Sequence, residues 1–125
     1  MSVSHYKDLK VWQFSMNIAK EVYHLTQGLP KQETYSLTSQ LQRAAVSIPS
    51  NIAEGHTRDS TKEFLHFISI GLGSLAELET QLMLAERFKY LDNEALAAIL
   101  IKTEETGRML RGLQRTLKAK LNSIP

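Results

Sequence analysis

Residues 43–55 read RAAVSIPSNIAEG, and this stretch decides the fold. At about 100° per residue it belongs to one helix with two faces. The apolar face comprises Leu37, Leu41, Ala45, Ile48 and Ile52, and the polar face comprises Arg43, Ser47, Asn51 and Glu54. Pro49 lies inside this helix and has no N–H for the Ala45 carbonyl, at a cost of about 3 kcal/mol in an ordinary helix interior.

The polar face has two interpretations. In the first, Ser47, Ser50 and Asn51 satisfy the carbonyl that Pro49 leaves free, while the alanines let a neighbouring helix approach closely. In the second, the polar side chains bind a ligand. Arg43 and Glu54 are eleven positions apart, about 16 Å along a helix axis, so they cannot pair with each other. We expect their partners on a neighbouring helix or subunit.

The length and composition indicate one compact domain. With 125 residues the chain is long enough for one hydrophobic core and short for two, so we expect a single domain over residues 1–125. It has no cysteine, which excludes disulfides and thiolate chemistry and is compatible with a reducing cytoplasm. The N-terminus has no apolar signal-peptide segment, and the longest uncharged run, residues 64–76, is shorter than the roughly 18 residues of a membrane span. We expect a soluble cytoplasmic protein without membrane contact.

Capping signals and apolar periodicity predict four helices. Their expected ranges are residues 9–26, a second helix that begins between residues 33 and 36 and ends at residue 55, residues 61–90 and residues 93–121. Asp8 and Asp92 are the expected N-caps of the first and fourth helices, and Ser60 with Glu63 forms a capping box before the third. Gly55 is expected to end the second helix with a positive φ. The short connections predict an all-α, up-down-up-down four-helix bundle.

The apolar rows predict which faces are buried. Residues 61–90 carry a heptad row with spacings of 4 and 3, as in helical bundles: Phe64, Ile68, Gly71, Leu75, Leu78, Leu82 and Ala85. A second row on this helix, from Phe67 to Leu91, is apolar only at its two ends. The two rows together are broader than one core requires, so we expect this helix to contribute to a subunit interface. In the first helix we expect two buried rows: Trp12, Met16, Ala19 and Tyr23, and Phe14, Ile18, Val22 and Leu25.

The predicted helix lengths also differ. The third and fourth helices, at about 30 residues, would be about 45 Å long, and the first two only about 30 Å. We therefore expect the longer pair to overhang the shorter one at the connection between the third and fourth helices. The apolar residues there would need cover from another subunit or from flanking segments: Leu84, Phe88, Leu96 and Ile99.

Two Glu-x-x-His pairs, Glu21 with His24 and Glu63 with His66, have the spacing of carboxylate-bridged di-iron sites. In an up-down bundle the first and third helices are parallel, and the two pairs are then offset by about 15 Å along the axis. That offset excludes shared metal ions, whose ligands lie about 2 Å away. The spacing suggests no nucleophile–base–acid set and no phosphate-binding loop. We therefore expect no metal, no cofactor and no enzymatic activity.

The basic residues cluster towards one end of the chain. Residues 107–125 contain five basic residues and no acid, although the net charge of the whole chain is only +2. Four of them follow spacings of 3, 4 and 3 and form one stripe on the fourth helix: Arg108, Arg111, Arg115 and Lys118. An arginine-rich stripe suits contacts with phosphate groups. The alternative is an ordinary solvated helix face.

Several motifs taken together resemble a known family. They are the segments at residues 8–13, DLKVWQ, at 33–37, ETYSL, at 43–55 with Arg58, and at 77–82, ELETQL. In these the chain resembles the four-helix-bundle proteins encoded in intervening sequences of bacterial 23S ribosomal RNA genes. That family is similar in turn to the accessory proteins of diversity-generating retroelements, which are homopentameric barrels with basic surfaces that engage reverse transcriptase and nucleic acid.

The resemblance implies a ring-shaped homo-oligomer, namely a pentamer, and it supplies no catalytic residues. It also implies that Arg43, Ser47, Asn51, Glu54 and Arg58 form a family signature, which serves assembly or ligand binding. With the basic stripe, it leads to the hypothesis of a non-enzymatic, homo-oligomeric protein that binds structured RNA, or DNA, through its fourth helix. The alternative is a scaffold that docks a protein partner such as a reverse transcriptase.

Overall fold

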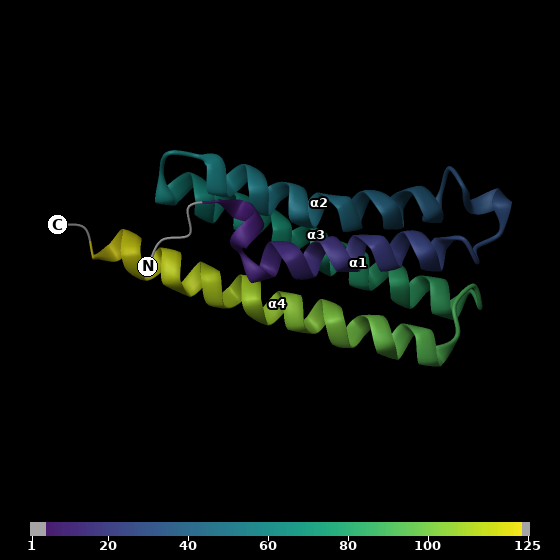
Figure 1. The fold of residues 1–125 in the computed structure, drawn as a ribbon. Helices are drawn as coiled ribbons and strands as arrows, with labels where there is room; N and C mark the ends of the chain where they lie inside the picture. The colour runs from purple at the N-terminus through teal and green to yellow at the C-terminus, as the bar shows by residue number, and fades with distance from the viewer. Residues whose placement is uncertain (1–4, 124–125) are drawn as a thin grey trace.

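A computed structural model describes residues 5–123 of the chain. In chain order its elements are η1 (Tyr6–Asp8), α1 (Lys10–Thr26), η2 (Lys31–Glu33), α2 (Leu37–Thr57), α3 (Thr61–Arg87) and α4 (Asn93–Asn122), where η marks a short 3₁₀ turn. Successive helices run antiparallel and lie side by side (Figure 1). Within the described residues α4 also packs against α1, whereas no Cα atom of α1 lies within 8 Å of a Cα atom of α3, so α1 and α3 lie on a diagonal of the bundle. The predicted all-α four-helix bundle is confirmed.

The core follows the two rows that the sequence marks as apolar. On α2, Leu41, Ala45, Ile48 and Ile52 are almost completely buried, and Leu37 is buried at the start of the same row. On α3, the heptad row is buried from Ile68 to Ala85, and Phe64 packs against its edge. Each row faces the interior because spacings of 3 and 4 keep its members on one side of a helix.

The start of each helix tests the capping predictions. The Ser60 hydroxyl accepts a hydrogen bond from the Glu63 N–H at 3.1 Å, and the Asp92 carboxylate accepts one from the Ala95 N–H at 2.8 Å. These two caps are confirmed. The prediction for Asp8 is wrong: Asp8 closes the turn η1, and Leu9 is the N-cap of α1 without a side-chain hydrogen bond. Because the chain coils into a 3₁₀ turn first, α1 begins one residue later than the pattern indicates.

Gly55 does not end α2. The helix continues to Thr57, and no described glycine has a positive φ. The reason for a glycine is the neighbouring helix instead: a Cβ on Gly55 would lie 2.7 Å from Cβ of Phe67 and 3.0 Å from Cδ1 of Phe64. Gly55 therefore allows the close approach of α2 and α3 just before they join.

The buried face of α1 is narrower than predicted. Its buried residues are Val11, Ser15, Ile18, Val22 and Thr26. The predicted row at Trp12, Met16, Ala19 and Tyr23 is wrong as a core face, since Met16 and Tyr23 are exposed and the other two are only half-buried. Phe14, at the opposite edge of the apolar arc, is exposed as well. The arc of apolar residues on α1 is wider than the strip that α2 and α4 cover, so only its centre is buried.

The two pairs of helices are level at the end where the expected overhang was placed. The connection between α3 and α4 lies at the same end as that between α1 and α2 (Figure 1). There the Tyr90 hydroxyl donates a hydrogen bond to Glu33 Oε2 at 2.9 Å, and Ile99 is only 3% exposed. The expected overhang at this end is therefore wrong. The last turns of α4 extend instead beyond the connection between α2 and α3 (Figure 1).

The helix α3 ends at Arg87, earlier than the predicted Tyr90, because the backbone turns into a left-handed cap. Lys89 has a φ of 66°, and its N–H donates to the Glu86 carbonyl while the Tyr90 N–H donates to the Ala85 carbonyl, both at 2.9 Å. This is the hydrogen-bond pattern of a Schellman motif. Its left-handed position is usually occupied by glycine, and here it is a lysine.

Polar residues interrupt the interior between α3 and α4. Thr103 is fully buried and its hydroxyl lies 2.8 Å from Glu79 Oε2 and 3.1 Å from the Leu100 carbonyl. Thr106 is equally buried, and its hydroxyl has no hydrogen-bond partner among the described residues. At the next position a Cβ on Gly107 would lie 3.3 Å from Leu75, so the helices approach closely here.

Candidate nucleic-acid interface

The predicted basic stripe lies on the surface of α4. Arg108, Arg111, Arg115 and Lys118 are all exposed, while Leu110 and Leu117 on the other side of the helix are buried. From the first to the last of the four basic residues the stripe spans about 15 Å along the helix axis. The periodicity of α4 therefore separates a buried leucine row from an exposed row of cations.

Most cations of the stripe are available to an external anion. Arg108 forms an ion pair with Glu105, one turn earlier, at 2.6 Å, and both side chains are largely exposed. Such exposed ion pairs within one helix contribute little to stability. Arg111, Arg115 and Lys118 form no ion pair with any described residue. Cations near a helix C-terminus also stabilise the helix dipole, which is the structural role that a solvated face would have.

The signature residues on α2 divide into a bonded pair and an exposed group. The Asn51 amide donates to the Ser47 carbonyl at 2.7 Å and to the Ser47 hydroxyl at 2.9 Å, and the Ser47 and Ser74 hydroxyls lie 2.8 Å apart. Asn51 thus bonds to the carbonyl of Ser47, whereas Pro49 frees the carbonyl of Ala45. The prediction that these side chains satisfy the Ala45 carbonyl is therefore wrong, because their hydrogen bonds go to other groups. They connect α2 to α3.

The charged members of the signature lie at the surface. Arg58 Nη2 is 3.5 Å from Glu54 Oε2, and the Arg58 guanidinium lies over the ring of Phe67 at 4.9 Å from the ring centre. Glu54 therefore finds its partner at the end of its own helix, and the expectation of a partner elsewhere is wrong for this residue. Arg43 is exposed and forms no ion pair with a described residue.

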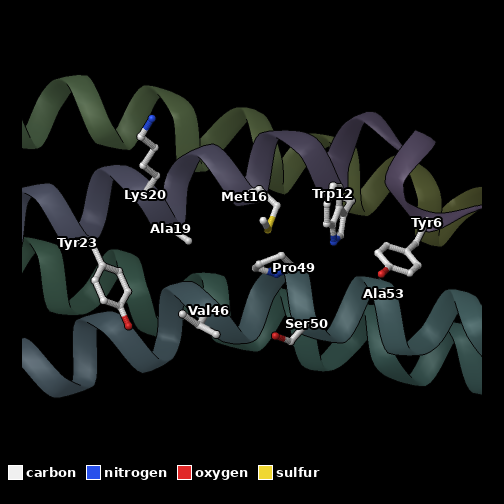
Figure 2. Close-up of a pocket in the computed structure, with 10 residues that line it drawn as sticks. All are labelled: Tyr6, Trp12, Met16, Ala19, Lys20, Tyr23, Val46, Pro49, Ser50 and Ala53. Atoms are coloured by element: carbon white, nitrogen blue, oxygen red, sulfur yellow. The ribbon is translucent and has the colours of Figure 1, made fainter.

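A groove between α1 and α2 is the feature that the sequence interpretation missed. It has a volume of about 500 Å³, and its apolar lining includes Trp12, Met16, Tyr23, Val46, Pro49 and Ala53. Met16 and Pro49 face each other across its middle (Figure 2). A second hollow of about 430 Å³, lined by Ser39, Gln42 and Arg43 among others, shares Tyr23 and Val46 with the first. We call this continuous surface the α1–α2 groove. The row from Trp12 to Tyr23 lines this groove, although its spacing predicted a core face.

The histidine and carboxylate pairs are separated in the structure. Glu21 forms an ion pair with Lys102 of α4, while Glu63 lies in the first turn of α3. Among residues 5–123, no cluster of three or more histidine, aspartate or glutamate side chains has a geometry suited to a metal ion. None of the described helices combines the length and the hydrophobicity needed to cross a membrane.

Comparisons with known proteins agree with the fold. The family model described as 23S rRNA-intervening sequence protein matches residues 7–112. A crystal structure of a protein of unknown function from the S23 ribosomal protein family, from Bacteroides thetaiotaomicron, is similar with a TM-score of 0.75 and 24% sequence identity. The similarity covers 83% of this chain and 97% of that chain. No curated protein matches the sequence. The family match includes Arg108 and Arg111 and ends before Arg115 and Lys118.

Proposed function

Because the chain belongs to the family of 23S rRNA-intervening sequence proteins, we propose that it is a non-enzymatic, homo-oligomeric protein that binds structured RNA through the basic stripe on α4. The observation that carries this proposal is the set of exposed cations at Arg108, Arg111, Arg115 and Lys118, three of which have no ion-pair partner among residues 5–123. Arginine binds phosphate oxygens through two parallel hydrogen bonds, so this residue type suits a nucleic-acid backbone.

The composition of α4 favours recognition of the backbone over recognition of bases. The helix contains no aromatic residue, so it offers no ring on which an unpaired base can stack. Cationic side chains on one helix face contact phosphates and sugars, which set position and orientation without reading sequence. A folded RNA stem with closely spaced phosphates is therefore the ligand that we expect, and duplex DNA is a weaker candidate.

Oligomerisation would multiply this surface. The resemblance to homopentameric barrels supports a ring-shaped homo-oligomer, and exposed apolar side chains on α1, α2 and α3 provide area for contacts between subunits. In a ring, each subunit would present the same stripe. Several stripes bound to one RNA molecule would raise the overall affinity through effective concentration.

The proposal is tested by measuring the affinity of the purified protein for a structured RNA stem over a series of salt concentrations. Four phosphate contacts per subunit correspond to a slope of about −3 to −4 in a plot of log K against log salt, on the scale measured for duplex DNA. The variant Arg111→Glu/Arg115→Glu removes two of these contacts. We expect it to bind at least tenfold more weakly and with a slope shallower by about 2.

A matched control separates a local contact from the effect of net charge. Lys31→Glu/Lys89→Glu makes the same change in charge at two exposed positions, one in η2 and one between α3 and α4. Both connections lie at the end of the bundle opposite the C-terminal end of α4 (Figure 1). This variant should bind RNA like the parent protein. If both double variants lost the same affinity, the stripe would have no special role. Binding that is absent or insensitive to salt would contradict the RNA proposal and favour a scaffold for a protein partner, such as a reverse transcriptase.

A further inference from the structure

The α1–α2 groove is concave, apolar and rimmed by positive charge. Its walls are built from Met16, Tyr23 and Val46, each of which is more than two-fifths exposed. The charged residues of its lining are Lys20 and Arg43, and neither hollow is lined by an acid. Lys20 contributes its stem and extends away from α2 (Figure 2), while Arg43 remains unpaired among the described residues. An occupant of this groove should be apolar and should carry an acid.

The same chain presents such a surface on α3. Ile70 and Leu84 on α3 and Phe88, its C-cap, are 39%, 40% and 55% exposed, although all three are large apolar residues. Their spacings in multiples of 7 and 4 place them on one side of the helix, and Glu77 lies on the same side, seven positions from both Ile70 and Leu84. We call this row the α3 ridge. Glu77 is exposed and forms no ion pair among the described residues.

The two surfaces match in length and carry charges of opposite sign. From Ser39 to Ala53 the α2 wall of the groove spans fourteen residue steps, and the ridge from Ile70 to Leu84 spans the same number, about 21 Å in each case. Residues 67–85 of α3 contain glutamates and no lysine or arginine. The midpoints of the two surfaces are Val46 and Glu77, and Arg43 lies within one turn of Val46. A second copy of the chain therefore offers the apolar, acidic partner that the groove requires.

We propose that the α1–α2 groove of one subunit receives the α3 ridge of the next subunit, with Arg43 opposite Glu77. The proposal rests on the homo-oligomer that the proposed function includes. The two surfaces differ, so the contact is heterologous, and each subunit has one surface of each kind. Repetition of such a contact closes a ring or continues as a filament. The groove thus gives Arg43, an exposed member of the signature without an ion pair among the described residues, a role in assembly.

The absence of cysteine from the sequence allows a direct test of this pairing. Val46→Cys and Glu77→Cys place a single thiol at the midpoint of the groove and of the ridge. Because these are midpoints, the two thiols lie near each other whether the helices cross in parallel or antiparallel. The two variants are co-expressed with different tags, and the purified oligomer is treated with a short bis-maleimide. We expect a covalent dimer that carries both tags, and none when either variant is expressed alone.

The control pairs Val46→Cys with Ile101→Cys, whose position on α4 is exposed and outside both surfaces. It should give no covalent dimer. A covalent dimer from one variant alone would show that like surfaces meet, and it would overturn the heterologous contact. A folded monomer in sedimentation experiments would overturn the proposal as well, while RNA binding by that monomer would leave the role of α4 intact. Crosslinking without RNA binding would support the contact between subunits and contradict the role of α4 in RNA binding.

A charge exchange tests the contribution of the ion pair. Arg43→Glu and Glu77→Arg should each raise the dissociation constant of the oligomer about tenfold, since each places like charges opposite one another. The double variant should restore association to within about threefold of the parent protein. If the single variants assemble normally, or if the double variant is weaker than both, Arg43 and Glu77 do not face each other. Circular dichroism of each variant verifies the helical fold.

Discussion

The hydroxyl oxygens of Ser47 on α2 and Ser74 on α3 lie 2.8 Å apart. The Asn51 amide donates to the Ser47 hydroxyl from one turn further along α2, so three polar side chains form a chain of hydrogen bonds between the two helices. Ser74 is buried, and Ser47 and Asn51 are half-buried. Partly buried polar groups of this kind stabilise a structure only when they are paired, because each lost its bonds to water on folding.

Replacement of Ser47 by alanine should destabilise the protein. The substitution removes the hydroxyl from both Asn51 and Ser74, and we expect the free energy of unfolding to fall by about 1–2 kcal/mol. Ser50→Ala is the matched control, since Ser50 is an exposed serine on the same helix, and it should change stability by less than about 0.5 kcal/mol. Urea denaturation measures both. Equal effects of the two substitutions would show that the hydrogen bonds of Ser47 to Asn51 and Ser74 contribute nothing to the stability.

Gly55 and Gly73 should respond in opposite ways to alanine. Each lies inside a helix, where alanine is favoured over glycine by about 1 kcal/mol. A Cβ at Gly73 would meet nothing within 4 Å, so Gly73→Ala should stabilise the protein by about 0.5–1 kcal/mol. A Cβ at Gly55 would lie 2.7 Å from Cβ of Phe67, so overpacking should outweigh the gain and leave Gly55→Ala about 1–2 kcal/mol less stable. Thermal unfolding distinguishes the two, and a Gly55→Ala protein that unfolds at a higher temperature than the parent would refute the close approach.

Thr103 and Thr106 offer a second pair with opposite expected results. Both are fully buried on α4, but only the Thr103 hydroxyl has hydrogen-bond partners within the described residues. Thr103→Val should lower the free energy of unfolding by about 1–2 kcal/mol, because it leaves the Glu79 carboxylate without its hydrogen-bond partner. Thr106→Val keeps the shape of the side chain and removes an unpaired hydroxyl, so it should raise the free energy of unfolding by about 1 kcal/mol. Chemical denaturation of the two variants measures both changes. A loss of stability in Thr106→Val would contradict the prediction, because it would mean that the Thr106 hydroxyl forms a stabilising hydrogen bond.

Tyr90 should make the stability depend on pH in the alkaline range. The hydrogen bond to the Glu33 carboxylate, together with burial, raises the pKa of the Tyr90 hydroxyl above its usual value of about 10. The folded state then holds the proton more tightly than the unfolded state. The stabilisation is complete below the unfolded-state pKa and is lost as the pH rises through the folded-state pKa. Urea midpoints measured between about pH 9 and pH 11 should fall more steeply for the parent protein than for Tyr90→Phe. Tyr35→Phe, at a position that is 96% exposed, should behave like the parent protein.

Much of the fold was predictable because its determinants are local or strictly periodic. The caps at Ser60 and Asp92 depend on residues three positions apart, and the rows on α2 and α3 depend only on helical spacing. The errors arose where distant segments decide the outcome. Gly55 is explained by the side chains of two phenylalanines, Phe64 and Phe67, on the next helix. The local cap after α3 was missed for another reason: Lys89 adopts a left-handed conformation that is uncommon for residues other than glycine.

The candidate interface shows the same division. The stripe on α4 follows from spacing alone, and the structure places all four of its cations at the surface. The α1–α2 groove was not predictable, because it depends on how much of the apolar arc of α1 its neighbours cover. Trp12, Met16 and Tyr23 have the spacing of core residues, and the sequence of α1 contains no indication that α2 leaves this edge open. Only the arrangement of both helices distinguishes a groove wall from a core.

The diagonal position of α1 and α3 has a consequence for folding kinetics. Each helix packs against the one that precedes it in the chain, so three of the four helix contacts join neighbours and close only short loops. The contact between α1 and α4 is the exception, since it joins the two ends of the chain. Topologies dominated by local contacts fold within microseconds to milliseconds. We therefore expect α1 and α4 to meet last, after a three-helix intermediate or transition state has formed, and native-state hydrogen exchange should find this contact the first to open.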